Sequence, residues 1–491
     1  MRNRVNKMKY REPLLLSAIL LLALVLRLIF FTGINASDSL FYAEYAHNFS
    51  NNQPNFSESH LGLRLGLLLP VSIIYSIFGV NEFSSNIFVL VTSLSSIILI
   101  YFFGRLFFNE KVGLLSAFLL SFFPLDVVYA TRLMSDLPSA FFIALSVYFF
   151  LKSEKNKKAN HNLMYIVSGI SLGIAYSIKE ISLLIGLFFL IYAIYNRKIK
   201  LGYFLMLLGF ILIFSMELLY FYKVTGNPLF RLSFVNSNWA TSLSSYGREN
   251  FPSSLVHYPY IIFTDNLISL FYVFIFIAIF YAIIKKKKET YNFLFWFISL
   301  LLYLSFGSAS FSRYTPFPAA SRLLSIITIP GILLLSYFLT RKEHIIRRVL
   351  MSSIILLLLV TSIGYIYISD ERSAIDNEKA AYEYLQTLPN VQVFADERTV
   401  KIFKYLSKYK ADNVVGFNSY DSRNPENSSA IDLSKVKNSY VVVNWKLINF
   451  LSSSKKGIKF PDEISDIPNN WVLKKEFKNK KNHKIDIYYI S

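Results

Sequence analysis

Long apolar runs recur along most of this chain, and they constrain its fold more than any other feature. A helix needs about 20 consecutive apolar residues to cross the hydrocarbon core of a bilayer. Runs of about this length lie at residues 14–31, 84–103, 112–129, 137–151, 163–177, 181–195, 203–222, 260–284, 291–306, 323–339 and 349–368. Hydrophobic residues make up 54% of the 491 residues, which is more apolar surface than a soluble domain buries. The sequence therefore predicts a polytopic α-helical membrane protein with about eleven transmembrane helices.

The distribution of Lys and Arg predicts how these helices are oriented. Basic residues precede the first run and cluster in every second loop, at Arg2, Arg4, Lys7, Lys9 and Arg11, at Arg105 and Lys111, and in the stretches 152–158, 197–200, 285–288 and 341–348. Because loops rich in Lys and Arg stay in the cytoplasm, the N-terminus is expected there. A secretory signal peptide is the alternative for the first run, but no small-residue cleavage site follows it cleanly. The net charge of +20 lies in these loops, so nucleic acid is not an expected partner.

The last quarter of the chain differs in character from the apolar part. Residues 370–491 are charged, with β-rich runs at 391–395 and 440–444 and a helix-like stretch at 399–410. This alternation predicts a small α/β domain that follows a transmembrane domain of residues 1–369. An odd number of spans places this domain on the extracytoplasmic side of the cell membrane.

The first outer loop, residues 32–81, is neither polar nor of low complexity, although loops of this length are usually functional or disordered. Its segments 39–49 and 61–78 are mainly apolar, and we expect two helices that lie in the membrane interface. Asp38 lies just before the first segment, and Arg64 lies near the start of the second. A carboxylate at the membrane rim can act as a catalytic base toward a lipid-borne substrate. The alternatives for Asp38 are a helix N-cap and a solvated loop acid.

Further charged residues lie at the ends of other predicted spans. They are Arg132 and Asp136, Lys179 and Glu180, and Arg313 and Arg322. A charge at a span end is costly unless it is paired or faces a wet cavity, so each of these is a candidate functional residue. Two alternatives stay open. Lys179 and Glu180 can form merely a short turn, and Arg132 and Asp136, one helical turn apart, can form a structural ion pair.

The sequence identifies no cofactor with certainty. It has no Cys, which excludes a disulfide framework, a thiol nucleophile and a cysteine-ligated metal. Glu58 and His60 have the spacing of two metal ligands on an extended segment, so a divalent metal remains possible, but two ligands do not make a site. No glycine-rich phosphate loop is present, which favours a lipid-linked donor over a soluble nucleotide sugar.

Several of these residues occur in an order that resembles a known class of membrane enzymes. The order is Asp38 with Tyr42-Ala43-Glu44, then Phe78-Gly79-Val80-Asn81-Glu82-Phe83, then Arg132 with Asp136-Leu137-Pro138, then Gly173 to Lys179, and finally Arg322-Leu323-Leu324 with Pro330. It is similar to the GT-C class of membrane glycosyltransferases over about residues 13–339. Within that class it most resembles the branch of the protein O-mannosyltransferases and the lipid A aminoarabinose transferase.

The chain also departs from both groups of this branch and from the oligosaccharyltransferases of the same class. The mannosyltransferases typically have Asp-Glu at the first position, whereas Ser39 follows Asp38 here. The aminoarabinose transferases tend to have Glu-Lys-Pro-Pro where this chain has Leu63-Arg64-Leu65-Gly66, so the resemblance does not extend to their sugar or their metal site. The sequence Trp-Trp-Asp-Tyr-Gly of the oligosaccharyltransferases is missing.

The resemblance implies a glycosyltransferase that moves a sugar from a polyprenyl-phosphate donor to an acceptor hydroxyl on the outer face of the membrane. Asp38 takes the position of the catalytic residue and would act as general base in an inverting single displacement. Arg64, with Arg313, Arg322 and Lys179, would bind the lipid phosphate, while Tyr42, Arg132, Asp136 and Glu180 would contact the sugar or the acceptor. The acceptor would be a protein, a lipid or a glycan. A transporter or flippase of lipid-linked sugars, and a receptor or assembly subunit, are the alternatives.

Overall fold

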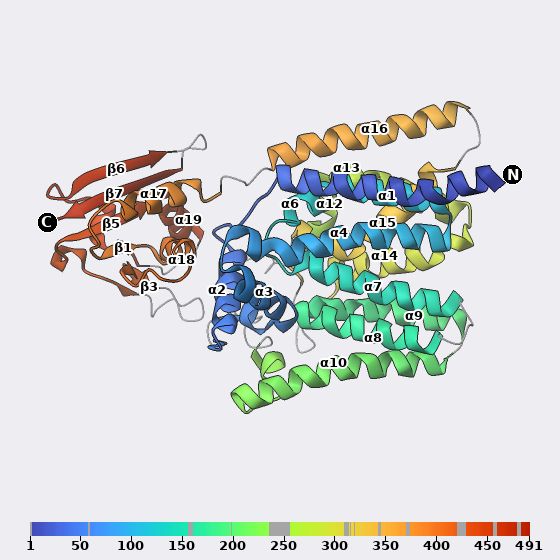
Figure 1. Cartoon of the computed structure of the whole chain (residues 1–491), viewed down its shortest axis with the longest axis horizontal. Coiled ribbons are helices and arrows are strands. Elements are labelled where there is room, and N and C mark those ends of the chain that lie inside the picture. Colours follow the sequence, from blue (N-terminus) through green and yellow to red (C-terminus); the bar gives the residue numbers. More distant parts are fainter. Residues whose placement is uncertain are drawn as a thin grey trace.

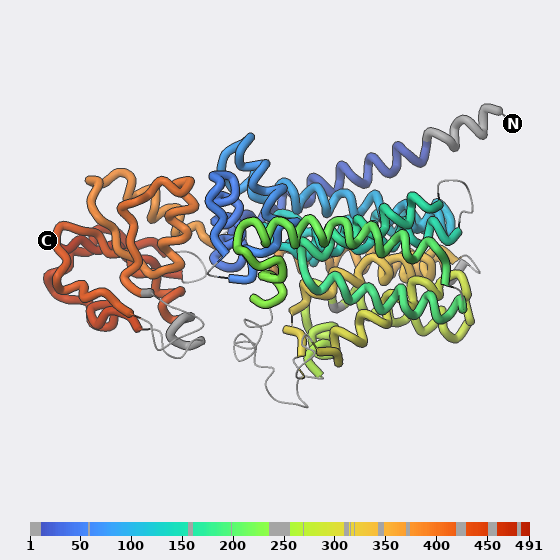
Figure 2. The backbone as a smooth tube through the Cα atoms, turned by 90° about the horizontal axis from the view of Figure 1, so that it is seen from below, coloured from blue at the N-terminus to red at the C-terminus, as the bar shows by residue number. Residues whose placement is uncertain are grey.

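The computed structural model describes residues 2–56, 59–155, 161–197, 199–234, 256–308, 314, 316–318, 320–341, 345–369, 374–419, 429–454, 459–478 and 483–491. A bundle of long helices forms the larger part, and a smaller domain with a β-sheet lies at one end of the bundle (Figure 1). The view in Figure 2 shows the same end-to-end arrangement. The predicted combination of a helical membrane domain and a small C-terminal α/β domain is thus confirmed.

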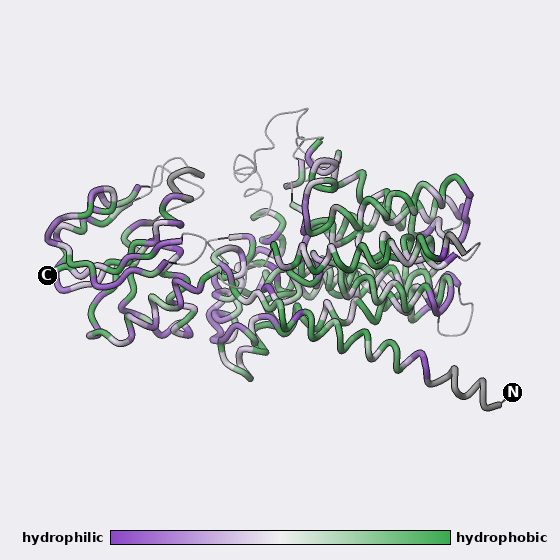
Figure 3. The backbone as a smooth tube through the Cα atoms, turned by 90° about the horizontal axis from the view of Figure 1, so that it is seen from above, coloured by the Kyte–Doolittle hydropathy of each residue, from purple (hydrophilic) through white to green (hydrophobic). Residues whose placement is uncertain are grey.

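Every predicted span corresponds to a helix of the bundle. The helices are α1 (Arg2–Ile29), α4 (Glu82–Phe107), α5 (Glu110–Phe122), α7 (Asp136–Lys155), α8 (His161–Ile178), α9 (Gly186–Asn196), α10 (Leu201–Thr225), α13 (Ser269–Ile284), α14 (Tyr291–Phe306), α15 (Ser325–Leu339) and α16 (Ile345–Ile368). Seven helices among the described residues are long and apolar enough to cross a membrane. Hydrophobic residues dominate along the bundle in Figure 3, whereas polar residues concentrate in the small domain and at the bundle ends.

Burial divides these helices into inner and outer ones. The most apolar window of the segment that contains α15 is 89% buried, whereas the corresponding windows of α1, α10 and α16 are 11%, 22% and 22% buried. Helices with an apolar surface that the protein leaves uncovered are suited to contact lipid. The chain is therefore a multi-pass membrane protein, with α15 in the middle of its bundle.

Three predicted spans are less regular than the sequence suggested. The run at 112–129 is divided into α5 and the short α6 (Pro124–Tyr129), because Pro124 lacks the N–H that would continue α5. The run at 260–284 is divided into α12 (His257–Thr264) and α13. The run at 181–195 begins as the 3₁₀ helix η2 (Glu180–Ile185) before it continues as α9.

A buried ion pair joins the outer helix α1 to the interior. Arg27 of α1 is fully buried and pairs with Asp126 of α6. Its Nε also donates to Ser93 Oγ of α4 at 2.8 Å. An unpaired charge at this place would be costly, so the three helices are tied together here.

The first outer loop folds into helices at the end of the bundle that carries the small domain (Figure 1). These are α2 (Asp38–Ser50), the 3₁₀ helix η1 (His60–Leu63) and α3 (Leu65–Phe78). The two helices expected in this loop are therefore present. Their apolar side chains form one cluster with side chains of the small domain, such as Val400 and Phe403.

The small domain is built around a five-stranded mixed sheet of order β2-β1-β5-β7-β6. Its strands are β1 (Val393–Ala395), β2 (Val414–Gly416), β5 (Ser439–Asn444), β6 (Val472–Lys478) and β7 (Lys484–Ile490), and its helices are α17 (Asp376–Gln386), α18 (Glu397–Leu406), α19 (Trp445–Ser454) and α20 (Asp462–Ser465). Strand β1 pairs in parallel with β2 and β5, whereas β7 pairs antiparallel with β5 and β6. The central strand β5 is buried along its whole length, so it forms the core of the domain.

Shorter elements complete the fold. They are η5 (Lys288–Thr290), η6 (Ser321–Leu324), η8 (Leu433–Lys435) and the two-stranded sheet of β3 (Asn418–Ser419) and β4 (Ser429–Ala430). The domain boundary predicted at residue 370 falls outside the described residues, between α16 and α17.

Candidate active site

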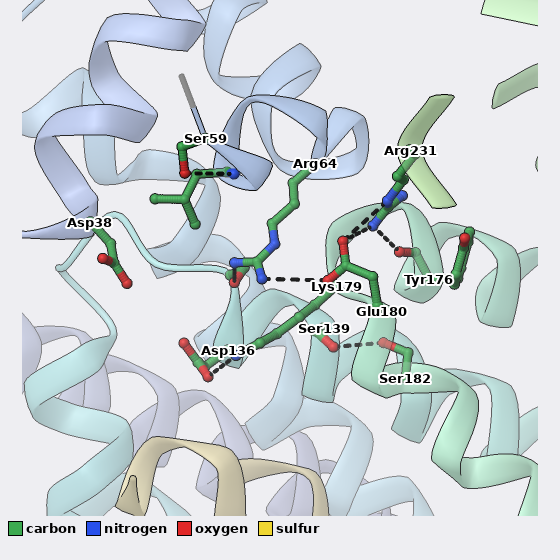
Figure 4. Close-up of polar contacts among 12 residues, drawn as sticks. Asp38, Ser59, Arg64, Asp136, Ser139, Tyr176, Lys179, Glu180, Ser182 and Arg231 are labelled. Atoms are coloured by element: carbon green, nitrogen blue, oxygen red, sulfur yellow. Dashed lines mark hydrogen bonds and ion pairs between the residues drawn. The ribbon is translucent and has the colours of Figure 1, made fainter. Parts of the chain in front are cut away.

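Charged side chains from several separate segments meet at the end of the bundle beside α2. Figure 4 shows the central part of this group, in which the side chains that lie close together are Arg64, Asp136, Lys179, Glu180 and Arg231. They come from the η1–α3 junction, the start of α7, the α8–η2 junction and the segment that follows α10. Asp38 lies to one side of them in the same view.

Asp38 is the first residue of α2 and lies opposite Arg322 of η6. The Arg322 Nη2 is 3.2 Å from Asp38 Oδ2, and the Asp38 side chain is 38% exposed. The sequence prediction assigned these two residues to different tasks, as the base and as a phosphate ligand. The structure brings them into one ion pair, with the carboxylate still open to a substrate.

Arg64 is buried, and its hydrogen bonds go to two hydroxyls and one acid. Its Nη1 donates to Ser135 Oγ at 3.0 Å and to the hydroxyl of Tyr42, while its Nη2 is 3.4 Å from Glu180 Oε2. Burial raises the pKa of Tyr42 to about 12, although Arg64 opposes the shift, so this phenol stays protonated. Among these contacts of Arg64, the one to its acid partner Glu180 is the longest.

Lys179 and Asp136 form the second ion pair of the group. Lys179 Nζ donates to Asp136 Oδ1 at 2.5 Å, and both residues are buried. The two residues belong to the α8–η2 junction and to the first turn of α7, so the pair joins two helices. Lys179 and Glu180 lie in a turn between two helices, which was one alternative for them. Each residue also takes part in an ion pair of the site.

Arg132 lies near this group in a different environment. Its guanidinium lies 4.8 Å from the centre of the Tyr129 ring, and the residue is 5% exposed. A guanidinium over an aromatic face is stabilised by the ring quadrupole. The sequence left open a structural ion pair between Arg132 and Asp136. In the structure, Asp136 forms its ion pair with Lys179.

Two residues of this site were missed in the sequence analysis. Arg231 follows α10 and binds Glu180 Oε1 through Nη2 at 2.7 Å and both carboxylate oxygens of Glu217 through Nη1, at 2.8 and 2.9 Å. Its Nη2 also donates to the carbonyl of Tyr176, at the end of α8, at 2.9 Å. A signal existed, because Glu217 is an acid inside the apolar run 203–222 and such an acid requires a partner.

The possible metal ligands are not supported by the described part of the chain. Glu58 lies outside the described residues, as does Arg313, one of the predicted phosphate ligands. Burial, with a smaller effect of Arg64, lowers the pKa of His60 to about 4. Within the described ranges, no group of three or more His, Asp or Glu residues is placed to hold a metal ion.

Comparison with known proteins links this arrangement to a fold. The family described as dolichyl-phosphate-mannose-protein mannosyltransferase matches residues 68–221. ArnT from Cupriavidus metallidurans, solved in the apo state and bound to undecaprenyl phosphate, is similar with a TM-score of 0.62 and 13% identity, over 96% of this chain and 97% of that chain. The chain has the GT-C fold.

A second solved structure has the same architecture. The archaeal oligosaccharyltransferase AglB from Archaeoglobus fulgidus, in complex with an inhibitory peptide and a dolichol-phosphate, matches with a TM-score of 0.58 and 11% identity, over 99% of this chain and 74% of that chain. A search of curated protein sequences gave no match. The resemblance to the GT-C class that the sequence motifs suggested is thereby confirmed, and it extends through the C-terminal domain.

Proposed function

We propose that this GT-C protein is a glycosyltransferase that moves a sugar from a polyprenyl-phosphate carrier to an acceptor hydroxyl. The observation that carries the proposal is the position of Asp38, a half-exposed carboxylate at the edge of a buried group of cations. Transfer from such a donor needs a base for the acceptor hydroxyl and positive charge for the departing phosphate. Asp38 would provide the first, and the cations beside it would provide the second.

The cations differ in how closely each is paired with an acid, and therefore in how easily each could bind a phosphate instead. Arg64 holds Glu180 at 3.4 Å and Arg322 holds Asp38 at 3.2 Å, whereas Lys179 is 2.5 Å from Asp136. Guanidinium groups also bind phosphate oxygens through two parallel hydrogen bonds. Arg64 and Arg322 are therefore the proposed phosphate ligands, with Lys179 as a supporting charge and Arg313 as a further candidate.

The predicted contacts to the sugar or acceptor divide into two kinds. Asp136 and Glu180 are occupied by cations, so we assign them to the orientation of Lys179 and Arg64. The Tyr42 hydroxyl contacts the Ser135 hydroxyl and accepts from Arg64, and Arg132 lies over the Tyr129 ring. Hydroxyl and guanidinium donors suit the oxygens of a sugar, so these two residues remain the proposed sugar or acceptor contacts.

The proposed reaction is a single displacement that inverts the anomeric carbon. The acceptor oxygen forms a bond to this carbon while the bond to the phosphate oxygen breaks, and the hydroxyl proton passes to Asp38. Polyprenyl phosphate leaves as an anion that Arg64 and Arg322 stabilise. The positive-inside pattern supports a cytoplasmic N-terminus, with the site and the small domain on the outer side.

The test is the release of polyprenyl phosphate from a panel of lipid-linked sugars by the purified protein. Asp38→Asn should abolish release, while Asp376→Asn, at the exposed first residue of α17, serves as the matched control. Full release by Asp38→Asn would remove this residue from the mechanism. Movement of the lipid-linked sugar across a bilayer without release would favour a flippase instead.

A further inference from the structure

Helix α18 of the small domain lies against α2, the helix that begins with Asp38. Lys401 Nζ is 2.9 Å from Glu44 Oε2, and the same ammonium lies 4.6 Å from the centre of the Phe41 ring. Arg398 Nη1 donates to the carbonyl of Ala36 at 3.4 Å. The Lys401 and Glu44 side chains are 14% and 26% exposed, so this ion pair is well shielded from solvent.

These contacts lie on both sides of Asp38 in the sequence. Ala36 lies two residues before it and Phe41 lies three residues after it, and both are held by α18. The start of α2 has no side-chain cap, because the N-cap residue Ser37 makes no capping hydrogen bond and binds Asn35 Oδ1 instead. Contacts from another domain therefore contribute to fixing this helix start.

Further hydrogen bonds and a ring contact stabilise α18 and its position beside α2. Asp396 caps α18 by accepting from the backbone N–H groups of Arg398 and Thr399, each at 3.1 Å. Farther along α2, the His47 ring stacks on Tyr409 with 4.3 Å between the ring centres. Helix α18 and the turn that follows it thus contact the segment from Ala36 to His47, which includes most of α2.

We propose that Lys401 and Arg398 are positioning residues for the transfer reaction. They hold the first turn of α2 so that the carboxylate of Asp38 faces the acceptor. The inference rests on the proposed glycosyltransferase function, and it gives the small domain a part in catalysis without placing chemistry in it. A displacement of the base by about 1 Å is enough to slow a reaction strongly, even when no reacting group is lost.

The chain offers a matched control for this contact. Lys379 of the same domain is 2.9 Å from Glu82 Oε2, at the first residue of α4, so its ion pair also joins the domain to the bundle, but through α4 instead of α2. Transfer kinetics and thermal unfolding are measured for Lys401→Met and Lys379→Met with a lipid-linked sugar donor. We expect Lys401→Met to lower kcat about tenfold with little change in the KM for the donor, and Lys379→Met to change neither.

Two further variants test the same contact from its other side. Glu44→Gln removes the partner of Lys401 and should give the same loss of kcat as Lys401→Met. The exchange Lys401→Glu with Glu44→Lys restores an ion pair and should recover most of kcat. These variants keep the test decisive if Lys401→Met fails to fold.

The outcomes separate this inference from the proposed function. If the wild-type protein and Lys379→Met release no polyprenyl phosphate from any donor, the proposed function fails and the inference fails with it. If the wild type is active and Lys401→Met and Glu44→Gln have its kcat, only the inference is overturned. Equal losses of kcat in Lys401→Met and Lys379→Met would also overturn it, since the contact would then serve domain docking alone.

Discussion

The guanidinium of Arg322 lies 3.2 Å from the carboxylate of Asp38, although the two residues come from opposite ends of the membrane domain sequence. One belongs to the first turn of α2 and the other to η6, which leads into the buried helix α15. A positive charge beside the proposed base serves two purposes. It orients the carboxylate, and it lies where the phosphate of a donor would leave.

Asp38→Asn should reduce transfer by at least about a hundredfold, because an amide cannot accept the acceptor proton. Stability should change little, since the pair with Arg322 is 38% exposed on the Asp38 side and partly exposed pairs contribute weakly. Turnover and thermal unfolding of the purified variant check both statements. A large fall in the unfolding temperature would mean that Asp38 has a structural task.

Arg64→Ala and Arg322→Ala should each weaken binding of polyprenyl phosphate by about 2–4 kcal/mol, because a charge-assisted contact to the phosphate is lost. Lysine at either position should restore only part of the affinity, since an ammonium keeps the charge but not the planar fork. Titration of each variant with polyprenyl phosphate is the measurement. Equal affinities for the wild type and both alanine variants would remove the arginines from phosphate binding.

Arg231→Met should destabilise the protein strongly, by about 3–5 kcal/mol, because it leaves Glu217 and Glu180 without this cation in a buried place. Glu217→Gln should cost less, since Arg231 keeps its contact with Glu180 at 2.7 Å. Thermal unfolding in detergent ranks the two variants. The reverse order would show that Arg231 is not shared between the two acids as the geometry implies.

Much of the fold follows from local patterns that the sequence displays. Apolar runs of bilayer length identify the helices, and the apolar segments after Asp38 and Arg64 identify α2 and α3. The division at Pro124 also has a local cause, because proline provides no N–H for the backbone hydrogen bond that would continue α5. The continuous hydropathy on both sides of Pro124 conceals this break.

The partners within the site could not be predicted in the same way. The sequence selected Asp38, Arg64, Lys179 and Arg322 as charges at span ends, but ion pairs between distant segments depend on how the helices pack. Glu217 lies within an apolar run, and this run gives no indication that Arg231 is its partner. An acid within such a run is a signal that a cation from another segment must lie nearby.

His60 should make stability depend on pH in a defined window. Burial lowers its pKa from 6.5 to about 4, so between these values the unfolded chain binds a proton that the folded chain does not. The contribution of His60 is therefore present above about pH 6.5 and is lost as the pH falls toward 4. The unfolding temperature of His60→Gln should fall less than that of the wild type over this range, and equal falls would contradict the assignment.

The orientation in the membrane can be tested with single cysteines, because the chain has none of its own. Lys437→Cys places a thiol at an exposed position of the small domain, and Lys285→Cys places one at the exposed C-terminal end of α13, in a basic stretch assigned to the cytoplasm. In intact cells a membrane-impermeant thiol reagent should label Lys437→Cys and should leave Lys285→Cys unlabelled until the cells are broken. The opposite pattern would place the site and the small domain in the cytoplasm. Labelling of both before breakage would show a leaky membrane, which labelling of a cytoplasmic cysteine-containing protein in the same cells would reveal, and the experiment would be repeated on sealed vesicles of known orientation.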